Sequence, residues 1–400
     1  MLKRLRVRSK LLLLLAPVLA AVVFFAAASA QDRFDAATVA ENEAEIATLA
    51  DAGDRLLLAL QIEQIRTIAA QAGADVDVES AVAATSEAAA HFEEVAARVA
   101  AFAGPQTAPA LSTARQRVAT IPELRARVDQ GGMSAGANQV QFDAILFSLD
   151  RLGDALLVEV ADVGLYRDLA AHQRLTRAQD ALGRLVARAE VGVIEGLDRA
   201  TNDDLRVQLV AATLALEQFR ADATEDQVRI LDRTTSRLGL PESGDALAAT
   251  LGALQAGDPA RALEGWTERG ESWLGGLAEV GSSLASQAVA AAESRADVAN
   301  GEAAGFLVLA STIVVAALLL AVLVGRSISR PLRRLTRDAQ RLADDELPTL
   351  VDTLRSGRAV DRDVLEPIAV SGRDETADLA RAVASIQEMT VEVAEEQSAL

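Results

Sequence analysis

Side chains that could act as nucleophiles or metal ligands are scarce in this sequence. Cysteine is absent, which excludes disulfide bonds, thiolate metal sites and a thiol nucleophile. The histidines are His91 and His172, which leave little for a histidine-ligated metal or a catalytic triad. His91 precedes "FEEVAARV" and is interpreted as a helix-surface residue. We therefore expect no catalytic residue, no metal and no cofactor in this chain.

The composition favours helices and argues against a nucleic-acid partner. Aromatic residues make up only 3% of the chain and alanine, leucine and valine dominate, whereas strands prefer β-branched and aromatic side chains. The net charge of −19 does not suit a protein that binds phosphates through a basic face, so we expect no nucleic-acid partner. The length of 400 residues allows roughly two to four domains.

Two apolar runs are long enough to cross a membrane. Residues 11–30 and 305–324 are each twenty residues without an ionisable side chain, and about 20 helical residues span the hydrocarbon core of a bilayer. Basic residues precede the first run and follow the second: Lys3, Arg4, Arg6, Arg8, Lys10, Arg326, Arg330, Arg333, Arg334 and Arg337. Positive residues favour the cytoplasmic side and contact anionic lipid head groups. We therefore expect a plasma-membrane protein with two spans, cytoplasmic termini and residues 31–304 outside the cell.

The first apolar run has a second interpretation. The sequence "ASA" before Gln31 resembles a signal-peptidase site, so the run could be a cleaved signal peptide. The run is longer than the usual apolar region of such a signal, and helical periodicity continues beyond it. These features favour an uncleaved anchor, and Gln31 as the mature N-terminus would reverse that interpretation.

The expected outer domain is an antiparallel helical bundle. Helical periodicity predicts helices over 35–71, 78–103, 139–160, 165–199 and 203–237, one more between "GPQTAP" and Pro122, a short one before "AGDPA" and a last one from about residue 261. The stretch "QGGMSAGAN" over 130–138 is the clearest loop. Because the first and last helices continue into the apolar runs, a change in their relative position would be transmitted into the membrane.

The segment after the second apolar run has the pattern of a parallel coiled coil. Pro331 lies near the start of a new helix, where its missing N–H does least harm. Apolar residues then recur in two seams: Ile328, Leu332, Leu335, Ala339 and Leu342, and later Leu379, Val383, Ile386, Thr390, Val393 and Leu400. Spacings of four and three give the 3.5-residue period of such a seam. Two such helices bury their seams most simply by pairing with a second chain, so a homodimer is expected.

This inner segment resembles a HAMP domain, the signal relay of bacterial transmembrane receptors. Pro331, both seams, and Asp374 and Glu375 in "DETADLARAVASI" match the family pattern, whereas Thr376 and Ala377 depart from it and the connector is longer. The stretches "LPTLVDTLRSG", "LEPIAVSGRDE" and "VEVAEEQSAL" look like the linker of actinobacterial sensor histidine kinases of the conservon type. Those kinases carry a nitrate/nitrite-sensing (NIT) outer domain.

The resemblance implies an order of parts. A basic cytoplasmic N-terminus (1–10) and a first span (11–30) precede a NIT-like sensor domain (31–304), and a second span (305–324), a HAMP-like relay (325–394) and the start of an output helix (395–400) follow. It also implies two anion-binding stretches. The chain has "QIEQIRT" with Gln64 where arginine is expected, and "QDALGRLVARAE" with Val186 at an arginine position.

Two interpretations of these stretches are open. In the first, Gln64, Arg66, Arg184 and Arg188 donate hydrogen bonds to a small anion such as nitrate or nitrite. In the second, Gln64 is a core amide and the arginines belong to a solvated helix face, with Asp180 and Arg184 as an ion pair one turn apart.

The output of the chain is also open. A histidine kinase needs a phospho-accepting histidine and a glycine-rich ATP lid, and neither follows the inner seams here. The resemblance implies the sensory and HAMP part of a two-component kinase, with a downstream kinase module or response-regulator system as partner. The alternatives are a stand-alone receptor that signals through a partner and a passive membrane anchor.

Overall fold

The computed structural model describes residues 7–196, 198–237, 266–346, 348 and 375–398. Within these ranges the chain is helical and contains no strand, which confirms the expected all-α class. The chain divides into two compact units, one of residues 33–302 and the other of residues 1–32 with 303–400. The first unit is called the sensor bundle below, and the described part of the second is called the relay unit.

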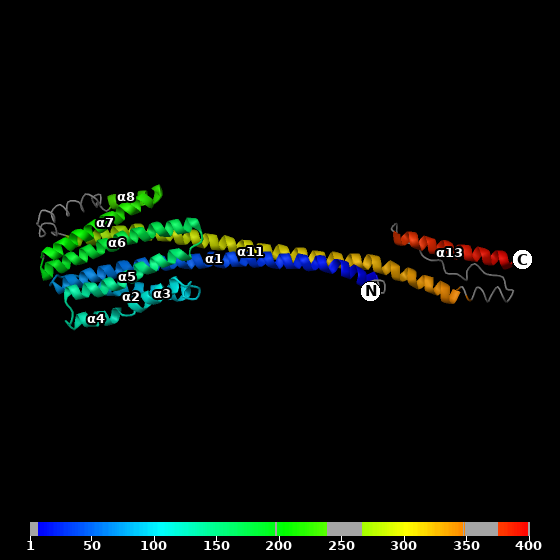
Figure 1. Cartoon of the computed structure of the whole chain (residues 1–400), viewed down its shortest axis with the longest axis horizontal. Coiled ribbons are helices and arrows are strands. Elements are labelled where there is room, and N and C mark those ends of the chain that lie inside the picture. The colour runs from blue at the N-terminus through cyan, green and yellow to red at the C-terminus, as the bar shows by residue number, and fades with distance from the viewer. Residues whose placement is uncertain (1–6, 197, 238–265, 347, 349–374, 399–400) are drawn as a thin grey trace. The chain divides into compact units, whose positions relative to one another are not determined.

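The sensor bundle is made of long helices that lie side by side (Figure 1). Two of them, α1 (Val7–Gln71) and α11 (Trp266–Arg341), continue beyond the bundle into the apolar runs. The others are α2 (Val78–Val99), α3 (Thr107–Val118), α4 (Ile121–Asp129), α5 (Ala135–Glu159), α6 (Val163–Glu195), α7 (Arg199–Asp222) and α8 (Glu225–Arg237). The predicted short helix before residue 260 lies outside the described residues.

Local capping explains where four of these helices begin. The side chains of Asp77, Ser134, Asp162 and Asp198 each accept a hydrogen bond from the backbone N–H three residues on, at the starts of α2, α5, α6 and α7. Such bonds satisfy N–H groups that have no partner inside the helix. Gly131 in the predicted loop has φ +69°, a conformation that glycine adopts without strain.

Side-chain contacts set the direction of the helices around α1. Arg33 pairs with Glu302 and Arg66 with Glu271, so α11 runs antiparallel to α1. Glu43 of α1 accepts a hydrogen bond from the N–H of Ala161, just before α6, and Gln61 of α1 accepts one from Gln179 of α6. In both pairs the two residues are 118 positions apart in the sequence, so α6 runs parallel to α1. Two apolar cores result. One lies mainly among α1 to α5, and the other mainly among α6, α7 and α11.

Several predicted helix boundaries are wrong, and α4 was not predicted. The helix predicted over 165–199 ends at Glu195, because Gly196 has φ +108° and Asp198 begins α7. The single helix predicted over 203–237 is two helices. Thr224 and Gln227 exchange hydrogen bonds between backbone N–H and side chain, of 2.9 and 3.3 Å, and this capping box starts α8.

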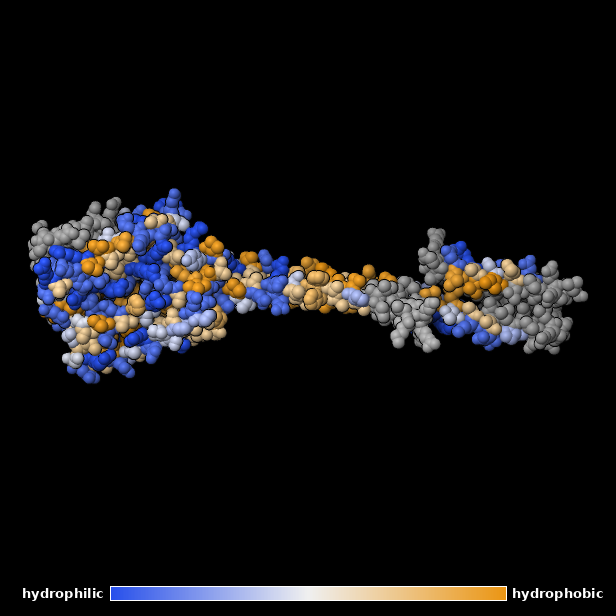
Figure 2. Space-filling model, viewed as in Figure 1, coloured by the Kyte–Doolittle hydropathy of each residue, from blue (hydrophilic) through white to orange (hydrophobic). Residues whose placement is uncertain are grey.

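The relay unit contains the two apolar runs. In the described residues, two helices are long and apolar enough to cross a membrane by length and composition, and an 18-residue stretch has a mean hydropathy of 1.2 in the first and 3.0 in the second. The apolar side chains of α11 between Leu307 and Val324 are largely exposed, and Figure 2 shows apolar surface along the narrow stretch that α1 and α11 form. A π-helical turn, η2 (Leu342–Glu346), follows α11.

The relay seams lie on α11 and on α13 (Glu375–Ser398). On α11, Leu332, Leu335 and Ala339 are partly buried, and the neighbouring Arg333 and Arg337 are exposed. On α13, Val383 is partly buried, whereas Leu379 and Ile386 are 50% and 61% exposed. The apolar face of α13 is therefore largely open to solvent in a single chain.

Candidate functional site

A layer of polar residues lies between the two apolar cores, where α1, α5 and α6 meet. Gln64 on α1 is fully buried, and its Nε2 donates to the carbonyl oxygen of Gln139 at 3.2 Å and to Oδ1 of Asp143 at 3.1 Å. Its Oε1 has no hydrogen-bond partner in the described part of the chain. A buried acceptor without a partner is uncommon in folded proteins, so it marks this layer for closer inspection.

The α6 side of the layer holds a buried carboxylate. Asp180 pairs with Arg184 one turn further along α6 at 2.5 Å, as predicted, while the Arg184 side chain stays about one-third exposed. Beside it, Gln179 donates to Oε1 of Gln61 on α1 at 3.4 Å. Gly183 allows this close approach, because a Cβ there would lie 2.6 Å from Nε2 of Gln61. The two helices therefore meet through amide groups.

Arg188 extends the layer toward α7. Its Nε donates to Oδ2 of Asp204 at 2.9 Å. Asp143 interacts electrostatically with both Arg184 and Arg188, so Gln64 and these two arginines surround one aspartate. The structure thus brings together three of the four predicted donors.

Burial makes the carboxylates of the layer hold their protons more tightly. Desolvation raises the pKa of Asp180 to about 6, against the opposing effect of Arg184. Desolvation also raises the pKa of Asp143, while the hydrogen bond from Gln64 and the nearby arginines lower it. When ionised, Asp143, Asp180 and Asp204 outweigh the two guanidinium groups, so the layer is net negative.

Arg66 does not belong to this layer. Its Nε donates to Glu271 on α11 at 3.4 Å, and its NH1 group donates to the carbonyl oxygen of Asp77 at 3.1 Å and to Ser80 at 3.2 Å. These bonds attach α1 to the start of α2 and to α11. Arg66 therefore has a positioning role distinct from that of Arg184 and Arg188.

Sequence reasoning missed Asp143 as a member of the layer. A signal was present, because Gln139, Asp143, Asp150 and Asp154 recur along one side of α5, at spacings of four, seven and four. Asp150 accepts hydrogen bonds from Gln173 and Arg177 on α6, and Asp154 from Arg177. A polar side of this length on a buried helix indicates a polar interface with a partner helix.

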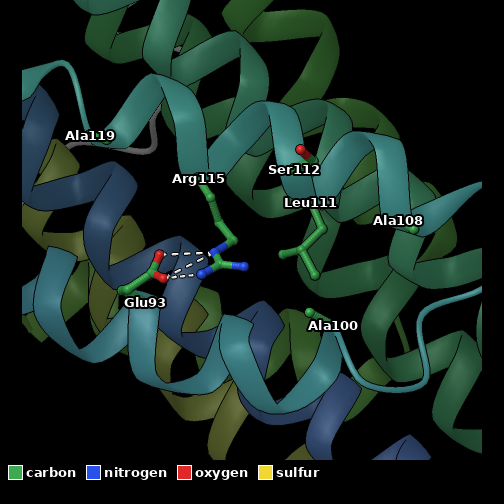
Figure 3. Close-up of a pocket in the computed structure, with 7 residues that line it drawn as sticks. All are labelled: Glu93, Ala100, Ala108, Leu111, Ser112, Arg115 and Ala119. Carbon is green, nitrogen blue, oxygen red and sulfur yellow. Dashed lines mark hydrogen bonds and ion pairs between the residues drawn. The ribbon is translucent and has the colours of Figure 1, made fainter.

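A separate groove of about 410 Å³ lies between α2 and α3 (Figure 3). Arg115 donates to both carboxylate oxygens of Glu93 at 3.0 Å, so the two charged side chains that line the groove neutralise each other. The rest of the lining is mainly small or apolar: Ala100, Ala108, Leu111, Ser112 and Ala119. This groove therefore has little polarity left for a charged ligand.

The predicted relay residues are only partly described. Pro331 lies inside α11 and is partly buried. The prediction that a new helix starts near Pro331 is therefore wrong, because α11 continues through this residue. Glu375 is the first residue of α13, and Asp374 lies outside the described residues.

These features define an all-helical chain in which a polar layer lies inside a bundle, and the first and last helices of the bundle extend into apolar runs long enough to cross a membrane. Residues 55–289 match the family model described as nitrate and nitrite sensing (NIT), and the chain belongs to this family. Residues 323–390 match the model of the HAMP domain. The NIT and HAMP domains together make the chain a signal-transducing sensor receptor.

One solved structure, that of the NasR transcription antiterminator, shares the fold. It is 14% identical to this chain and superposes with a TM-score of 0.59 over 90% of this chain and 98% of that one. At this identity the likeness concerns the fold alone. No curated protein matches the chain.

Proposed function

We propose that the chain is a homodimeric transmembrane receptor that relays an extracellular cue to a histidine kinase of a two-component system. The observation that carries this proposal is the single helix α11. It contacts α1 through Glu271 in the sensor bundle, contains the apolar run, and ends at Arg341 inside the region that matches the HAMP model. A displacement of α11 in the sensor bundle would therefore be transmitted along the helix to its other end.

The topology of the proposal has residues 31–304 outside the cell and both termini in the cytoplasm. The basic residues beside each apolar run support it. Because the chain has no cysteine, single cysteines can report it directly. An impermeant thiol reagent added to intact cells should label Ala36→Cys and leave Glu392→Cys unlabelled, and both positions are exposed. Labelling of both, or of Glu392→Cys alone, contradicts the proposed topology.

The cue we propose is a small anion, nitrate or nitrite, at the polar layer. The family match and the guanidinium groups of Arg184 and Arg188 support it. Each of these guanidinium groups already pairs with a carboxylate, and the Asp143 side chain lies near both. An entering anion must compete with these carboxylates, so we expect weak binding by the natural chain.

Removing one competing charge tests this site. In calorimetry of the full chain in nanodiscs, Asp143→Asn should bind nitrate or nitrite more tightly than the natural chain, by about tenfold for one removed like charge near the anion. Arg188→Gln should abolish the gain, and Arg66→Gln should leave it intact. Equal affinity of the natural chain and Asp143→Asn contradicts an anion site in this layer.

The kinase output is proposed from the HAMP match and the resemblance of the chain's ends to sensor kinases. It is tested by reconstituting the receptor with the kinase module that its own gene or operon encodes. Ligand-dependent phosphotransfer is the expected result. Dimers that never alter the activity of that module would favour a membrane anchor.

A further inference from the structure

A buried carboxylate and a buried imidazole face each other in the sensor bundle, apart from the polar layer. Asp54 on α1 and His172 on α6 are 8% and 2% exposed, and Oδ2 of Asp54 lies 4.0 Å from Nε2 of His172. The hydroxyl of Thr176 donates to Oδ1 of Asp54 at 2.8 Å. His172 Nδ1 has no hydrogen-bond partner in the part of the chain that the structure describes.

The pair lines a small internal cavity of about 20 Å³. Thr176 and Gln173 complete its polar side, and the remaining lining comes mostly from leucines of α1 and α5. A single water molecule needs roughly 10–15 Å³ and two to four polar partners. The cavity is therefore large and polar enough to hold one water beside the two titratable groups.

The backbone of α11 passes directly over this pair. A Cβ on Gly281 would lie 3.0 Å from Oδ2 of Asp54 and 3.9 Å from Cε1 of His172. The pair thus lies where α1, α6 and α11 meet, and α1 and α11 are the helices that extend into the apolar runs. Any change in the size or hydration of the pair acts on the contact between these two helices.

Other charges near the pair are already engaged. On α1, Asp51 and Arg55 flank Asp54 and pair with each other at 2.7 Å. On the α5 side, Asp150 accepts hydrogen bonds from Gln173 at 2.9 Å and from Arg177 at 3.2 Å.

On the far side, α11 adds no charge beside the pair, whereas α6 carries one more carboxylate, Asp168. The α11 residues on either side of Gly281 in the core, Val280 and Leu284, are apolar. On α6, Asp168 lies one turn before His172 and accepts from Gln227 on α8. Of the charged groups that act on the Asp54 carboxyl, His172 has the largest effect, and Asp51 and Arg55 act more weakly.

We propose that Asp54 and His172 form a proton-binding site that makes the packing of α11 against α1 depend on external pH. With a proton on the pair, the two groups are together neutral, either as an ion pair or as two uncharged groups. Without it, an ionised Asp54 is left in the apolar interior, where an uncompensated charge is strongly unfavourable. Burial, the largest effect on this carboxyl, raises the pKa of Asp54, which favours proton uptake.

The direction of the switch follows from this charge balance. Acidification closes the contact between α11 and α1, and alkaline conditions loosen it by hydrating Asp54. The consequence for signalling rests on the proposed receptor function, but the packing change inside the sensor bundle does not. It can be measured without any output module.

Tryptophan emission measures this packing in the unmodified chain. Both tryptophans, Trp266 and Trp273, lie on α11, and Trp273 is buried. We expect the emission of the full chain in nanodiscs to change in one step as the pH rises and the shared proton leaves the pair. Asp54→Asn and His172→Gln, which keep shape and hydrogen bonding, should each abolish the step.

Two controls keep the test decisive. Asp180→Asn removes another buried carboxylate with a raised pKa and should retain the step. Circular dichroism identifies variants that lose helix, and if either pair variant does, Gly281→Ala replaces it, with an expected shift of the step midpoint because its Cβ crowds Asp54. A natural chain without a step, or a step that survives in Asp54→Asn or is lost in Asp180→Asn, overturns the proposal.

Discussion

Leu56 in the sensor bundle and Leu379 in the relay unit both occupy apolar positions of long helices, yet the first is fully buried and the second is half exposed. The sensor bundle buries two apolar cores within one chain and also encloses charged groups, while some of its apolar side chains, such as Phe147 and Val207, stay more than half exposed. The relay unit leaves the seam of α13 open. This open seam is what the proposed homodimer predicts, since a second copy of the chain would cover it.

The largest expected effect on the free energy of unfolding comes from removing the buried ion pair between Arg125 and Glu63 in the sensor bundle. Arg125 forms two hydrogen bonds, of 2.7 and 2.8 Å, with Glu63, whose side chain is 1% exposed. Arg125→Ala leaves this carboxylate buried without its cation, so the free energy of unfolding should fall by about 3–5 kcal/mol. Denaturant unfolding followed by circular dichroism measures it.

The matched variant in the relay is Arg381→Ala. Its partner is Asp378, and both side chains are about two-thirds exposed. We expect a loss of no more than about 0.5 kcal/mol, since solvent screens such pairs. Equal losses for Arg125→Ala and Arg381→Ala would remove the proposed contrast between the two regions.

The pH dependence of stability should arise from the sensor bundle, and Asp180 is its clearest source. Its pKa is about 6 in the folded chain against an ordinary value of 3.8, so the folded state binds the proton more tightly. The associated stabilisation is complete below about pH 4 and is lost as the pH rises through 6, a change of at most about 3 kcal/mol.

Unfolding measured at pH values on both sides of this range checks the assignment. Asp180→Asn should reduce the dependence by the share that Asp180 contributes, while Asp378→Asn, at an exposed relay position, should leave it unchanged. A profile that is identical in the natural chain and Asp180→Asn would show that Asp180 keeps an ordinary pKa.

A smaller effect is expected at the start of α8. Thr224→Ala removes the side chain that caps the N–H of Gln227, and losses of this kind are about 1 kcal/mol. The control is Thr213→Ala in the middle of α7, where the hydroxyl bonds only to the carbonyl of Leu209 and little change is expected. Equal effects would show that the capping box does not separate α7 from α8.

The sequence was sufficient to predict the fold class, the two apolar helices and most helix positions, because apolar periodicity and glycine-rich breaks are local signals. The break between α7 and α8 was also local, since Thr224 and Gln227 have the spacing of a capping box, but continuous periodicity on both sides concealed it. The prediction of helix boundaries fails where a capping signal and a continuous amphipathic pattern compete.

The candidate site was less predictable. Gln64, Arg184 and Arg188 were identified from family motifs, yet their surroundings depend on the register of α1, α5 and α6, which no local pattern contains. Asp143 therefore enters the layer only in the folded chain. The same holds for Asp54 and His172, which are 118 residues apart in sequence and meet because α1 and α6 run parallel at that constant separation.

Disulfide cross-linking at position 335 in membranes shows most immediately whether a second copy of the chain completes the relay. Leu335→Cys, in the partly buried seam of α11, should form disulfide-linked dimers on oxidation, whereas Arg337→Cys, on the exposed side of the same helix, should cross-link far less. Absence of dimers at position 335, or equal cross-linking at both positions, would contradict a relay built from two chains.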